Sequence, residues 1–540
     1  MNYYVLENSN NAYFQEDLSD FPECSYEAST EGQPSGVVLA VDLDKKLMKV
    51  ENSEAHTMIE ASTASYKTRG CVFPYLLSCC HSGSSMIVHD CKGELLKFME
   101  PSLTDKGYKK VVINFRDVKE GDRYNIWERP AWEYKYGNKG RAIEMFKSIC
   151  SSIFSKYHSS EDPFWEFSAS TYCLMLVMLC AEIYDDYKDV TFENIFKLHI
   201  QSNERNLSST YIHRYFENDK DSLLYMLGSL TMEAPNDTKR SIFSIFVQGL
   251  SDYIMNDELC DMTYNSTFSI EEIIEDKVAV FLVSRDEASV HDELISCMVD
   301  QFYSILVDTA HEKYNGVLPR RVEIILDEFA NMGKLNNITK MVSAARSRNI
   351  RFLFCVQSYK QLSQVYGKDV ASIILDNCDN TIYLHSSDIE TLKMVSDRCG
   401  ERIYEDGSKR PLVSIEKLQY LNKGQALFLL NRTRPFFFQL PDASCYGVPF
   451  SEKLNLAKRD MQKRKSIDFR KVAEEKWEND KLLQIALREE KKAKQEKEEE
   501  KEHKKKERKA NRDKEKAIKD SRGVIKGIDN ALKSRFVYDN

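Results

Sequence analysis

One stretch of the chain, residues 321–358, constrains the fold more than any other. It holds two short apolar runs, Val322–Leu326 and Arg351–Val356, and between them a segment with apolar residues at helical spacing. Runs of this length that are rich in Ile, Val, Leu and Phe and are closed by polar residues are typical of buried strands in a parallel sheet. A strand, a helix and a second strand in this order predict a βαβ unit, and therefore an α/β fold class.

Polar residues stand where each predicted strand begins or ends. Asp327 and Glu328 follow the first strand, Gln357 follows the second, and Arg346 and Arg348 precede the second. Since ligands bind at the carboxyl ends of parallel strands, we expect one acid to hold Mg²⁺, the other to orient water, and the Gln to sense a γ-phosphate. The arginines are expected to reach phosphate charge across a subunit boundary. A structural βαβ unit with a solvated acid pair is the alternative, because the pattern is loose.

The order of residues in this stretch is more specific than its residue types. The segments LDEFANMGKL, AARSRNI and CVQSYKQL resemble the signature of the type IV secretion coupling proteins, the TraG-type conjugative DNA-transfer ATPases. The resemblance runs in order from Gly36 to Leu440 and includes SMIVHDCKGELL and DRYN. It implies a RecA-like P-loop NTPase that forms a homo-hexamer, uses ATP and Mg²⁺, and hands a relaxase–DNA substrate to the components of a secretion channel.

The phosphate loop departs from the family pattern. The family's G-x-x-x-x-G-K-[ST] aligns with ASTASYKT, so Ala61 and Tyr66 replace both glycines while Lys67 and Thr68 are kept. Glycine permits φ > 0 and a close approach of the backbone to phosphate. A Tyr in that conformation costs about 1–2 kcal/mol and its ring occupies space. The sequence therefore leaves two alternatives, a working loop without glycines or a decayed nucleotide site.

The resemblance assigns the remaining site residues. Thr68 would meet Mg²⁺ together with Asp327. The nucleotide contacts that it implies are Ser65, Tyr66, Lys67, Thr68, Arg69, Asp90 and Lys92.

Composition and resemblance together divide the chain. We expect a loose polar leader at 1–35, a RecA-like motor domain at 36–137 and 236–450, an inserted all-α domain at 138–235, and a charged tail, helical or disordered, at 451–540. Within the tail, Arg488–Arg522 carries 16 basic and 11 acidic residues, many at the i,i+4 spacing that supports an exposed helix. The tail is either simply solvated or a basic arm for DNA or for an acidic partner surface.

Composition also limits location and partners. The net charge of −9 argues against a large generic nucleic-acid surface. The 14 cysteines form no CxxC or CxxH pair, as in a reducing cytosol without a zinc site. The apolar run Tyr172–Ala181 is too short to span a membrane, and the first residues lack the features of a signal peptide. We expect a cytoplasmic protein, or one peripheral at the inner face of the cell membrane, that meets the membrane only through partners.

Three functions fit these observations. The first is a coupling ATPase of a conjugative type IV secretion system. The second is a nucleotide-independent docking platform of the same fold, which the missing glycines favour. The third is a double-stranded DNA translocase of the HerA/FtsK group, against which the inserted helical block and the segments ANMGK and SRNI stand.

Overall fold

The protein is described here by a computed structural model, which covers residues 18–26, 32–157, 162–206, 209–285, 291–404, 406–451, 453–454 and 456–535. The chain divides into two compact units. The first contains residues 1–200 and 222–467, and the second contains residues 201–221 and 468–540.

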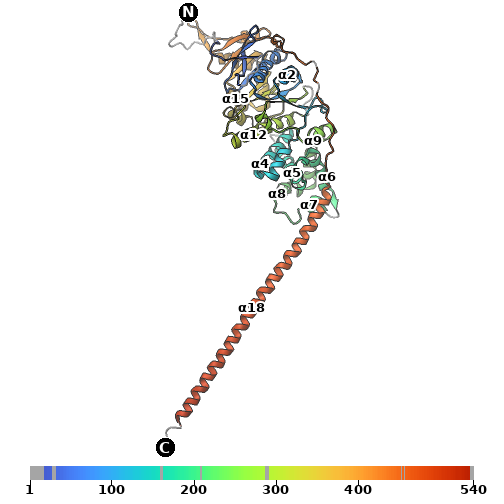
Figure 1. Ribbon diagram of the computed structural model, residues 1–540, viewed down its shortest axis with the longest axis vertical. Coiled ribbons are helices and arrows are strands. Elements are labelled where there is room, and N and C mark those ends of the chain that lie inside the picture. The colour runs from blue at the N-terminus through green and yellow to red at the C-terminus, as the bar shows by residue number, and fades with distance from the viewer. Residues whose placement is uncertain are drawn as a thin grey trace. The chain divides into compact units, whose positions relative to one another are not determined.

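A nine-stranded sheet forms the centre of the first unit (Figure 1). Its strand order is β16-β15-β12-β4-β11-β10-β5-β9-β6, and the strands from β12 to β6 are parallel, while β15 and β16 run antiparallel at one edge. The strands are β4 (Thr57–Ala61), β5 (Ser85–Asp90), β6 (Lys109–Asn114), β9 (Val278–Val283), β10 (Val322–Leu326), β11 (Ile350–Val356), β12 (Asn380–His385), β15 (Gln425–Leu429) and β16 (Phe436–Gln439).

Both faces of the sheet are covered, which is why its central strands are almost continuously apolar. One face packs on α1 (Phe73–Ser82) and α2 (Glu94–Asp105). On the other face, Tyr303 contacts Phe352 and Leu392 packs with Tyr383. The helices around that second face are α12 (Asp292–Lys313), α13 (Ile338–Ala344), α14 (Tyr359–Tyr366), α15 (Lys368–Asn377) and α16 (Ile389–Cys399). The predicted α/β class is confirmed, and so are both strands of the 321–358 stretch.

A small antiparallel sheet lies beside this core. It contains β1 (Glu23–Ser25), β2 (Val37–Asp42) and β3 (Leu47–Glu51), in the order β1-β3-β2. The residues before 36 were expected to be a loose leader, but β1 pairs with β3 and buries Cys24 and Tyr26. The rest of that leader at 1–17 and 27–31 lies outside the described residues.

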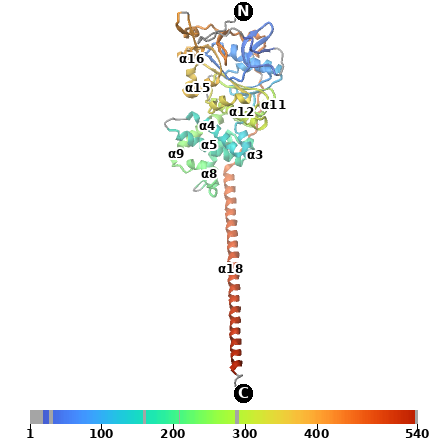
Figure 2. The same cartoon turned by 90° about the vertical axis from the view of Figure 1, so that its left-hand side faces the viewer.

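A layer of helices forms the other part of the first unit, as Figure 2 shows. It contains α3 (Glu128–Tyr136), α4 (Lys139–Phe154), α5 (Phe164–Ile183), α6 (Phe192–Asn203), α8 (Leu223–Met232) and α9 (Asn236–Ile254). Helix α9 places Phe246 on Phe154 and Tyr172, and a Cβ at Gly249 would stand 2.4 Å from the Phe154 ring. The helical layer therefore continues past residue 235, where the sequence placed its end.

Helix α5 is the buried centre of this layer. Among the described residues it is the one helix long and apolar enough to cross a membrane by length and composition, and 72% of its apolar window is buried. It extends well beyond the ten-residue run Tyr172–Ala181 on which the sequence argument relied. Helices α4, α8 and α9 pack on α5 (Figure 1).

Residues 456–467, expected to begin the tail, pack against the first unit instead. The carboxylate of Asp261, 1% exposed, lies between the guanidinium groups of Arg123 at 2.9 Å and Arg459 at 3.3 Å. Arg464 pairs with Glu193 at 2.6 Å.

The remaining short elements of the first unit are η1 (Thr68–Val72), η2 (Ser155–Tyr157), η3 (Tyr187–Asp189), α10 (Asp257–Met262), α11 (Glu272–Glu275), η4 (Arg346–Arg348), β13 (Glu401–Ile403), β14 (Lys409–Pro411), α17 (Ile415–Gln419) and η5 (Ala443–Tyr446).

The second unit is built on one long helix, α18 (Phe469–Arg535), with β7 (Arg205–Asn206), β8 (Ser209–Thr210) and α7 (Tyr211–Tyr215) at its start. Arg214 stacks over the Trp477 ring at 4.1 Å and pairs with Glu474 at 3.0 Å. From Lys481 to Lys533 every residue is exposed. Of the two alternatives for Arg488–Arg522, helical or disordered, the structure shows the helix, and α18 extends beyond this stretch in both directions.

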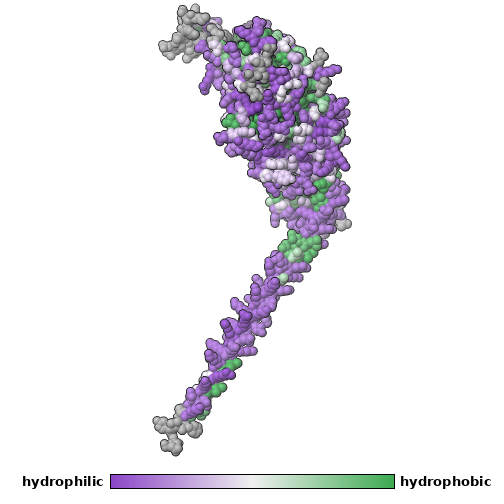
Figure 3. Space-filling model, in the orientation of Figure 1, coloured by the Kyte–Doolittle hydropathy of each residue, from purple (hydrophilic) through white to green (hydrophobic). Residues whose placement is uncertain are grey.

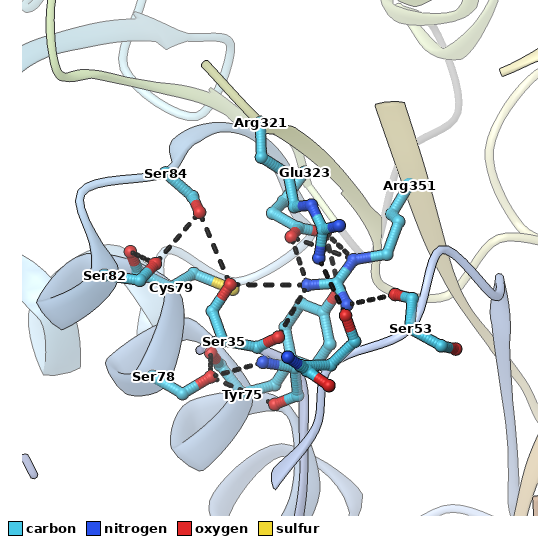
Figure 4. Close-up of polar contacts among 12 residues, drawn as sticks. Ser35, Ser53, Tyr75, Ser78, Cys79, Ser82, Ser84, Arg321, Glu323 and Arg351 are labelled. Carbon is cyan, nitrogen blue, oxygen red and sulfur yellow. Dashed lines mark hydrogen bonds and ion pairs between the residues drawn. The ribbon is translucent and has the colours of Figure 1, made fainter. Parts of the chain in front are cut away.

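A buried ion pair joins the two central strands β10 and β11 (Figure 4). Glu323 and Arg351 are partners in the strand register, and the guanidinium Nε of Arg351 lies 3.0 Å from Glu323 Oε1. Tyr75 of α1 donates its hydroxyl to Glu323 Oε2 at 2.6 Å, and Arg351 also donates to the carbonyls of Ser35 and Ser53. This network fixes α1, β10 and β11 relative to one another.

Candidate functional site

The carboxyl ends of β4, β11 and β10 are neighbours in the sheet and bring four predicted residues together. Lys67, in the loop after β4, places its Nζ 2.6 Å from Glu328 Oε1 and 2.8 Å from Asp327 Oδ1. Gln357, directly after β11, donates from Nε2 to Glu328 Oε2 at 3.0 Å. A lysine, two acids and a glutamine thus meet at one sheet edge, as the sequence predicted for the strand ends.

The charges in this cluster support one another. The side chains of Lys67 and Asp327 are only 9% and 11% exposed. Burial alone lowers the pKa of Lys67, but the carboxylates of Asp327 and Glu328 outweigh it and hold that pKa above its ordinary value. Burial alone raises the pKa of Glu328, but Lys67 and the hydrogen bond from Gln357 outweigh it and hold that pKa below its ordinary value. Lys67 and Glu328 are therefore ionised at neutral pH.

Asp327 is fixed by contacts from two sides. Its Oδ1 lies 2.8 Å from the Nζ of Lys67. The backbone of Asp327 is held by His89, whose Nδ1 lies 2.9 Å from the Asp327 carbonyl oxygen. Burial lowers the pKa of His89, so the imidazole is neutral. Carboxyl and hydroxyl oxygens, such as those of Asp327 and Thr68, are the hard ligands that Mg²⁺ takes. The residues present fit a magnesium–nucleotide group.

Three residues around the cluster adopt left-handed backbone conformations without being glycine. The φ angles are +62° at Ala64, +77° at Tyr66 and +54° at Glu328. Such residues cost of order 1–2 kcal/mol each and tend to cluster at functional sites. Tyr66 therefore keeps the backbone shape for which the family uses its second glycine. Ala61 ends strand β4, so the first glycine position shows no left-handed conformation here.

The ring of Tyr66 packs against the apolar core of the sheet. Its hydroxyl donates to Asp442 Oδ2 at 2.6 Å, and Arg69 binds the same carboxylate through Nε at 2.8 Å and Nη2 at 2.6 Å. Asp442 lies in the segment after β16, and Arg69 also lies over the Phe98 ring of α2 at 5.5 Å. Gly70 makes room for the ring, because a Cβ there would stand 2.7 Å from Tyr66 Cδ1. The Tyr66 hydroxyl therefore binds Asp442 at the end of the sheet domain, while Lys67 binds Asp327 and Glu328.

Other predicted residues have local structural partners. The backbone N–H of Ser65 donates to the Ser62 carbonyl at 3.2 Å, which forms a turn in the loop. Asp90 is 1% exposed, and its carboxylate accepts from the backbone N–H groups of Glu94 and Leu96 at the start of α2. Burial raises the pKa of Asp90 to about 6. Lys92 is exposed at the same strand end, and its charge adds a smaller lowering to the pKa of Glu328 beyond the effects of burial, Lys67 and Gln357.

The two predicted arginines lie at the opposite, amino-terminal end of the parallel strands. Both belong to η4, which leads into the first residue of β11, while Gln357 follows its last. Arg346 pairs with Asp379 at 2.6 Å, and Arg348 donates to the Ala344 carbonyl at 2.8 Å. The structure does not bring them to the acid pair of their own chain. Their action across a subunit boundary stays a prediction.

Asp442 is the site residue that sequence analysis missed. The segment Pro441-Asp442-Ala443-Ser444 does carry a turn signal, and Asp442 Oδ1 accepts from the Ser444 backbone N–H at 2.9 Å. That signal predicts a local turn but gives no partner, and the hydrogen-bonded Arg69 is 373 residues away. Asn331, whose Nδ2 lies 3.2 Å from Glu328 Oε2, was also missed, although it stands in the quoted LDEFANMGKL segment.

Lys67 lies in the loop after β4, and the acid pair follows β10, two strands away in the parallel sheet. This arrangement defines the RecA-like P-loop class of proteins. Within that class, the chain belongs to the type IV secretory system conjugative DNA transfer family, whose sequence model matches residues 27–415. The family match covers the parallel strands of the sheet, the helical layer and all the predicted site residues, and it ends before β15.

Individual relatives are distant. Protein VirD4 of Rhizobium rhizogenes is 23% identical over 368 residues, which is 65% of this chain and 50% of that protein. Conjugal transfer protein TraG of Escherichia coli is 23% identical over 374 residues, 64% of this chain and 55% of that protein. The chain thus spans about half the length of the curated relatives it matches.

Solved structures with the same fold include the plasmid coupling protein TrwB. Its complex with the ATP analogue ADPNP matches 83% of this chain and 99% of its own, with a TM-score of 0.60 and 16% identity. Its complex with ADP and Mg²⁺ matches 80% and 92%, with a TM-score of 0.58 and 16% identity. At this identity the likeness concerns the fold.

Proposed function

We propose that this protein binds Mg·ATP at the Lys67–Asp327–Glu328 cluster and hydrolyses it while acting as a coupling protein of a conjugative type IV secretion system. One observation carries the nucleotide proposal: Lys67 reaches both acids within 2.8 Å although its loop lacks glycine, because Tyr66 supplies the left-handed backbone. Family membership supports the wider role.

Each residue has a part in the proposed reaction. Mg²⁺, when bound with ATP, would neutralise phosphate charge at Asp327 and Thr68. Lys67 would hold the β- and γ-phosphates, and its present ion pairs with Asp327 and Glu328 keep its side chain at the sheet edge. Glu328, ionised and held by Gln357, would orient the attacking water and accept its proton. Gln357 would report the state of the γ-phosphate to β11.

The wider proposal concerns partners. The chain would assemble as a homo-hexamer, recruit a relaxase with its conjugative DNA, and pass both to the channel components. It would work in the cytoplasm or at the inner face of the cell membrane. A docking platform that needs no nucleotide remains the second candidate, because the loop lacks both expected glycines. The positive φ of Tyr66 and its hydrogen bond to Asp442 favour the ATPase.

Mg·ATP binding to the purified protein tests the first part of the proposal. We expect saturable binding by the wild type and no binding by Lys67→Ala. Lys67 is the lysine of the Lys67–Asp327–Glu328 cluster, so this variant loses the positive charge that would hold the phosphates. Lys368→Ala is the matched control, because that side chain is 79% exposed and makes only a 3.9 Å ion pair. Glu328→Gln should still bind ATP, with turnover reduced about 10²- to 10⁴-fold as for loss of a general base. Thermal unfolding checks that each variant is folded.

Conjugative DNA transfer, measured in cells that produce the protein, tests the proposed role in secretion. The Lys67→Ala variant, produced at the wild-type level, is expected to abolish conjugative transfer, while Lys368→Ala leaves it unchanged. Transfer that persists with Lys67→Ala, or wild-type protein that binds no ATP at millimolar concentration (only about 4 kcal/mol of binding free energy), would show a docking platform.

A further inference from the structure

The C-terminal end of α18 carries an apolar face that no described residue covers. Ile518, Val524, Ile525, Ile528 and Leu532 are each 51–65% exposed. Figure 3 shows apolar residues exposed near this end of the helix. At 3.6 residues per turn, these five side chains fall within an arc of about 120° on one side of the helix. The segment is therefore amphipathic, whereas residues 488–516 before it are almost entirely charged.

The other side of this segment is basic. Between residues 516 and 533 the charged residues are Lys516, Lys519, Asp520, Arg522, Lys526, Asp529 and Lys533, five basic and two acidic. None of them falls inside the apolar arc when residues are placed at helical spacing. A helix with an apolar face and a lysine- and arginine-rich polar face has the composition of one that lies flat on an anionic lipid surface.

A coiled coil with a second copy fits the pattern less well. The apolar face spans Ile518 to Leu532, about two heptads, whereas a coiled coil needs three or four. The preceding part of α18, residues 488–516, is almost entirely charged, so no apolar seam continues toward the N-terminal side. Ser521 also stands in the middle of the apolar arc. The arc is wider than the narrow seam of a two-stranded coiled coil.

We propose that residues 516–533 of α18 form an amphipathic helix that binds the surface of an anionic lipid bilayer. The five apolar side chains would enter the boundary between headgroups and acyl chains, and the flanking lysines and Arg522 would contact lipid phosphates. This inference rests on the second unit alone and does not depend on nucleotide binding. It gives the chain a direct membrane contact, where the sequence predicted contact only through partners.

Sedimentation of the full chain with vesicles tests the proposal. Wild-type protein is expected to bind vesicles of phosphatidylcholine mixed with phosphatidylglycerol, to bind phosphatidylcholine alone far more weakly, and to dissociate as salt is raised. The double variant Ile525→Glu/Ile528→Glu should partition at least about tenfold more weakly, because two buried apolar side chains are lost. Lys519→Glu/Lys526→Glu should weaken binding to the anionic vesicles only.

The same helix offers a matched control. Leu482 and Leu487 are 65% and 47% exposed, but they lie about 40 Å or more along α18 from residue 516, in a stretch (478–490) with four acidic and two basic residues that an anionic surface does not attract. Leu482→Glu/Leu487→Glu is therefore expected to bind vesicles like the wild type. Equal binding by wild type and Ile525→Glu/Ile528→Glu would overturn the proposal, as would wild-type protein that binds no vesicles. If, without vesicle binding, sedimentation velocity shows a dimer that this variant loses, the face belongs to a second copy and the lipid proposal fails.

Discussion

At the scale of single residues, the unusual feature is a tyrosine that performs a glycine's conformational role. Tyr66 has φ +77° and would be strained by about 1–2 kcal/mol in isolation. A charge-assisted hydrogen bond to Asp442, itself held by Arg69, offsets that strain. The Arg69 hydrogen bond is the main cause that lowers the pKa of Asp442, so the acceptor stays ionised. The missing glycine is thus replaced by a contact with the segment that follows β16.

Removing only the Tyr66 hydroxyl tests this replacement. Tyr66→Phe is expected to weaken Mg·ATP binding about tenfold, because a charge-assisted hydrogen bond contributes about 1.5–3 kcal/mol and the left-handed loop loses it. Tyr66→Gly should bind at least as well as wild type, since glycine adopts φ > 0 without strain. Isothermal titration calorimetry measures both.

Tyr446→Phe is the control for this pair. Tyr446 is 4% exposed, and its hydroxyl has no hydrogen-bond partner among the described residues, so its loss should not change affinity. If Tyr66→Phe bound Mg·ATP as tightly as the wild type, Asp442 would have no part in shaping the loop.

At the scale of elements, the sheet is held in register by a buried charge pair as well as by apolar contacts. Glu323 and Arg351 interrupt otherwise apolar strands, are 0% and 2% exposed, and share Tyr75 of α1 as a partner. Buried pairs of this kind contribute little to stability overall, but losing one partner leaves an uncompensated charge. The pair thus makes the positions of α1, β10 and β11 depend on one another.

A double-mutant cycle measures this dependence. Glu323→Leu and Arg351→Met are each expected to lower the free energy of unfolding by about 3–5 kcal/mol, while the double variant should lose much less than the sum. Urea denaturation of the full chain gives all three values. Arg410→Met is the exposed control: Arg410 pairs with Asp406 at 3.0 Å, both side chains are more than half exposed, and the loss should be under about 1 kcal/mol. Additive losses in the cycle would contradict the coupling.

At the scale of the whole molecule, the arginines and the acids lie at opposite edges of one sheet. A chain acting alone cannot bring Arg348 to its own Glu328 without refolding β11, which separates them. An assembly can do so by placing one subunit's arginine edge against the acid edge of the next. The proposed hexamer would therefore contain complete sites only between subunits.

Subunit mixing tests this arrangement. Lys67→Ala and Arg348→Ala are each expected to remove ATPase activity, and a mixture should recover part of it, because some interfaces join an intact Lys67 site to an intact Arg348. Arg348 is chosen because Arg346 is already paired with Asp379. A mixture of Lys67→Ala with Glu328→Gln is the control and should recover nothing, since both defects lie in the same site. No recovery in the first mixture would contradict a role for Arg348 across subunits.

The sequence by itself determined the local part of this structure. Continuous apolar runs specified the strands β10 and β11, because a strand buried on both faces must be apolar along its length. The polar residues that close the runs then marked Asp327, Glu328 and Gln357 as members of one sheet edge. The α/β class and the helical block followed from the same periodicities, and the family followed from the wording of the motifs.

Only the tertiary structure decided which of these pieces meet. The strand order places β4 beside β11, which lets Lys67 reach Glu328 across 261 residues of sequence. It also places the segment after β16 where Asp442 can hold Tyr66. Residue patterns report burial and local conformation, whereas these contacts depend on which strands pair and on side-chain packing between distant segments. For that physical reason a loop that lacks its expected glycines has, once folded, its lysine beside the acids and its tyrosine hydroxyl bonded to Asp442.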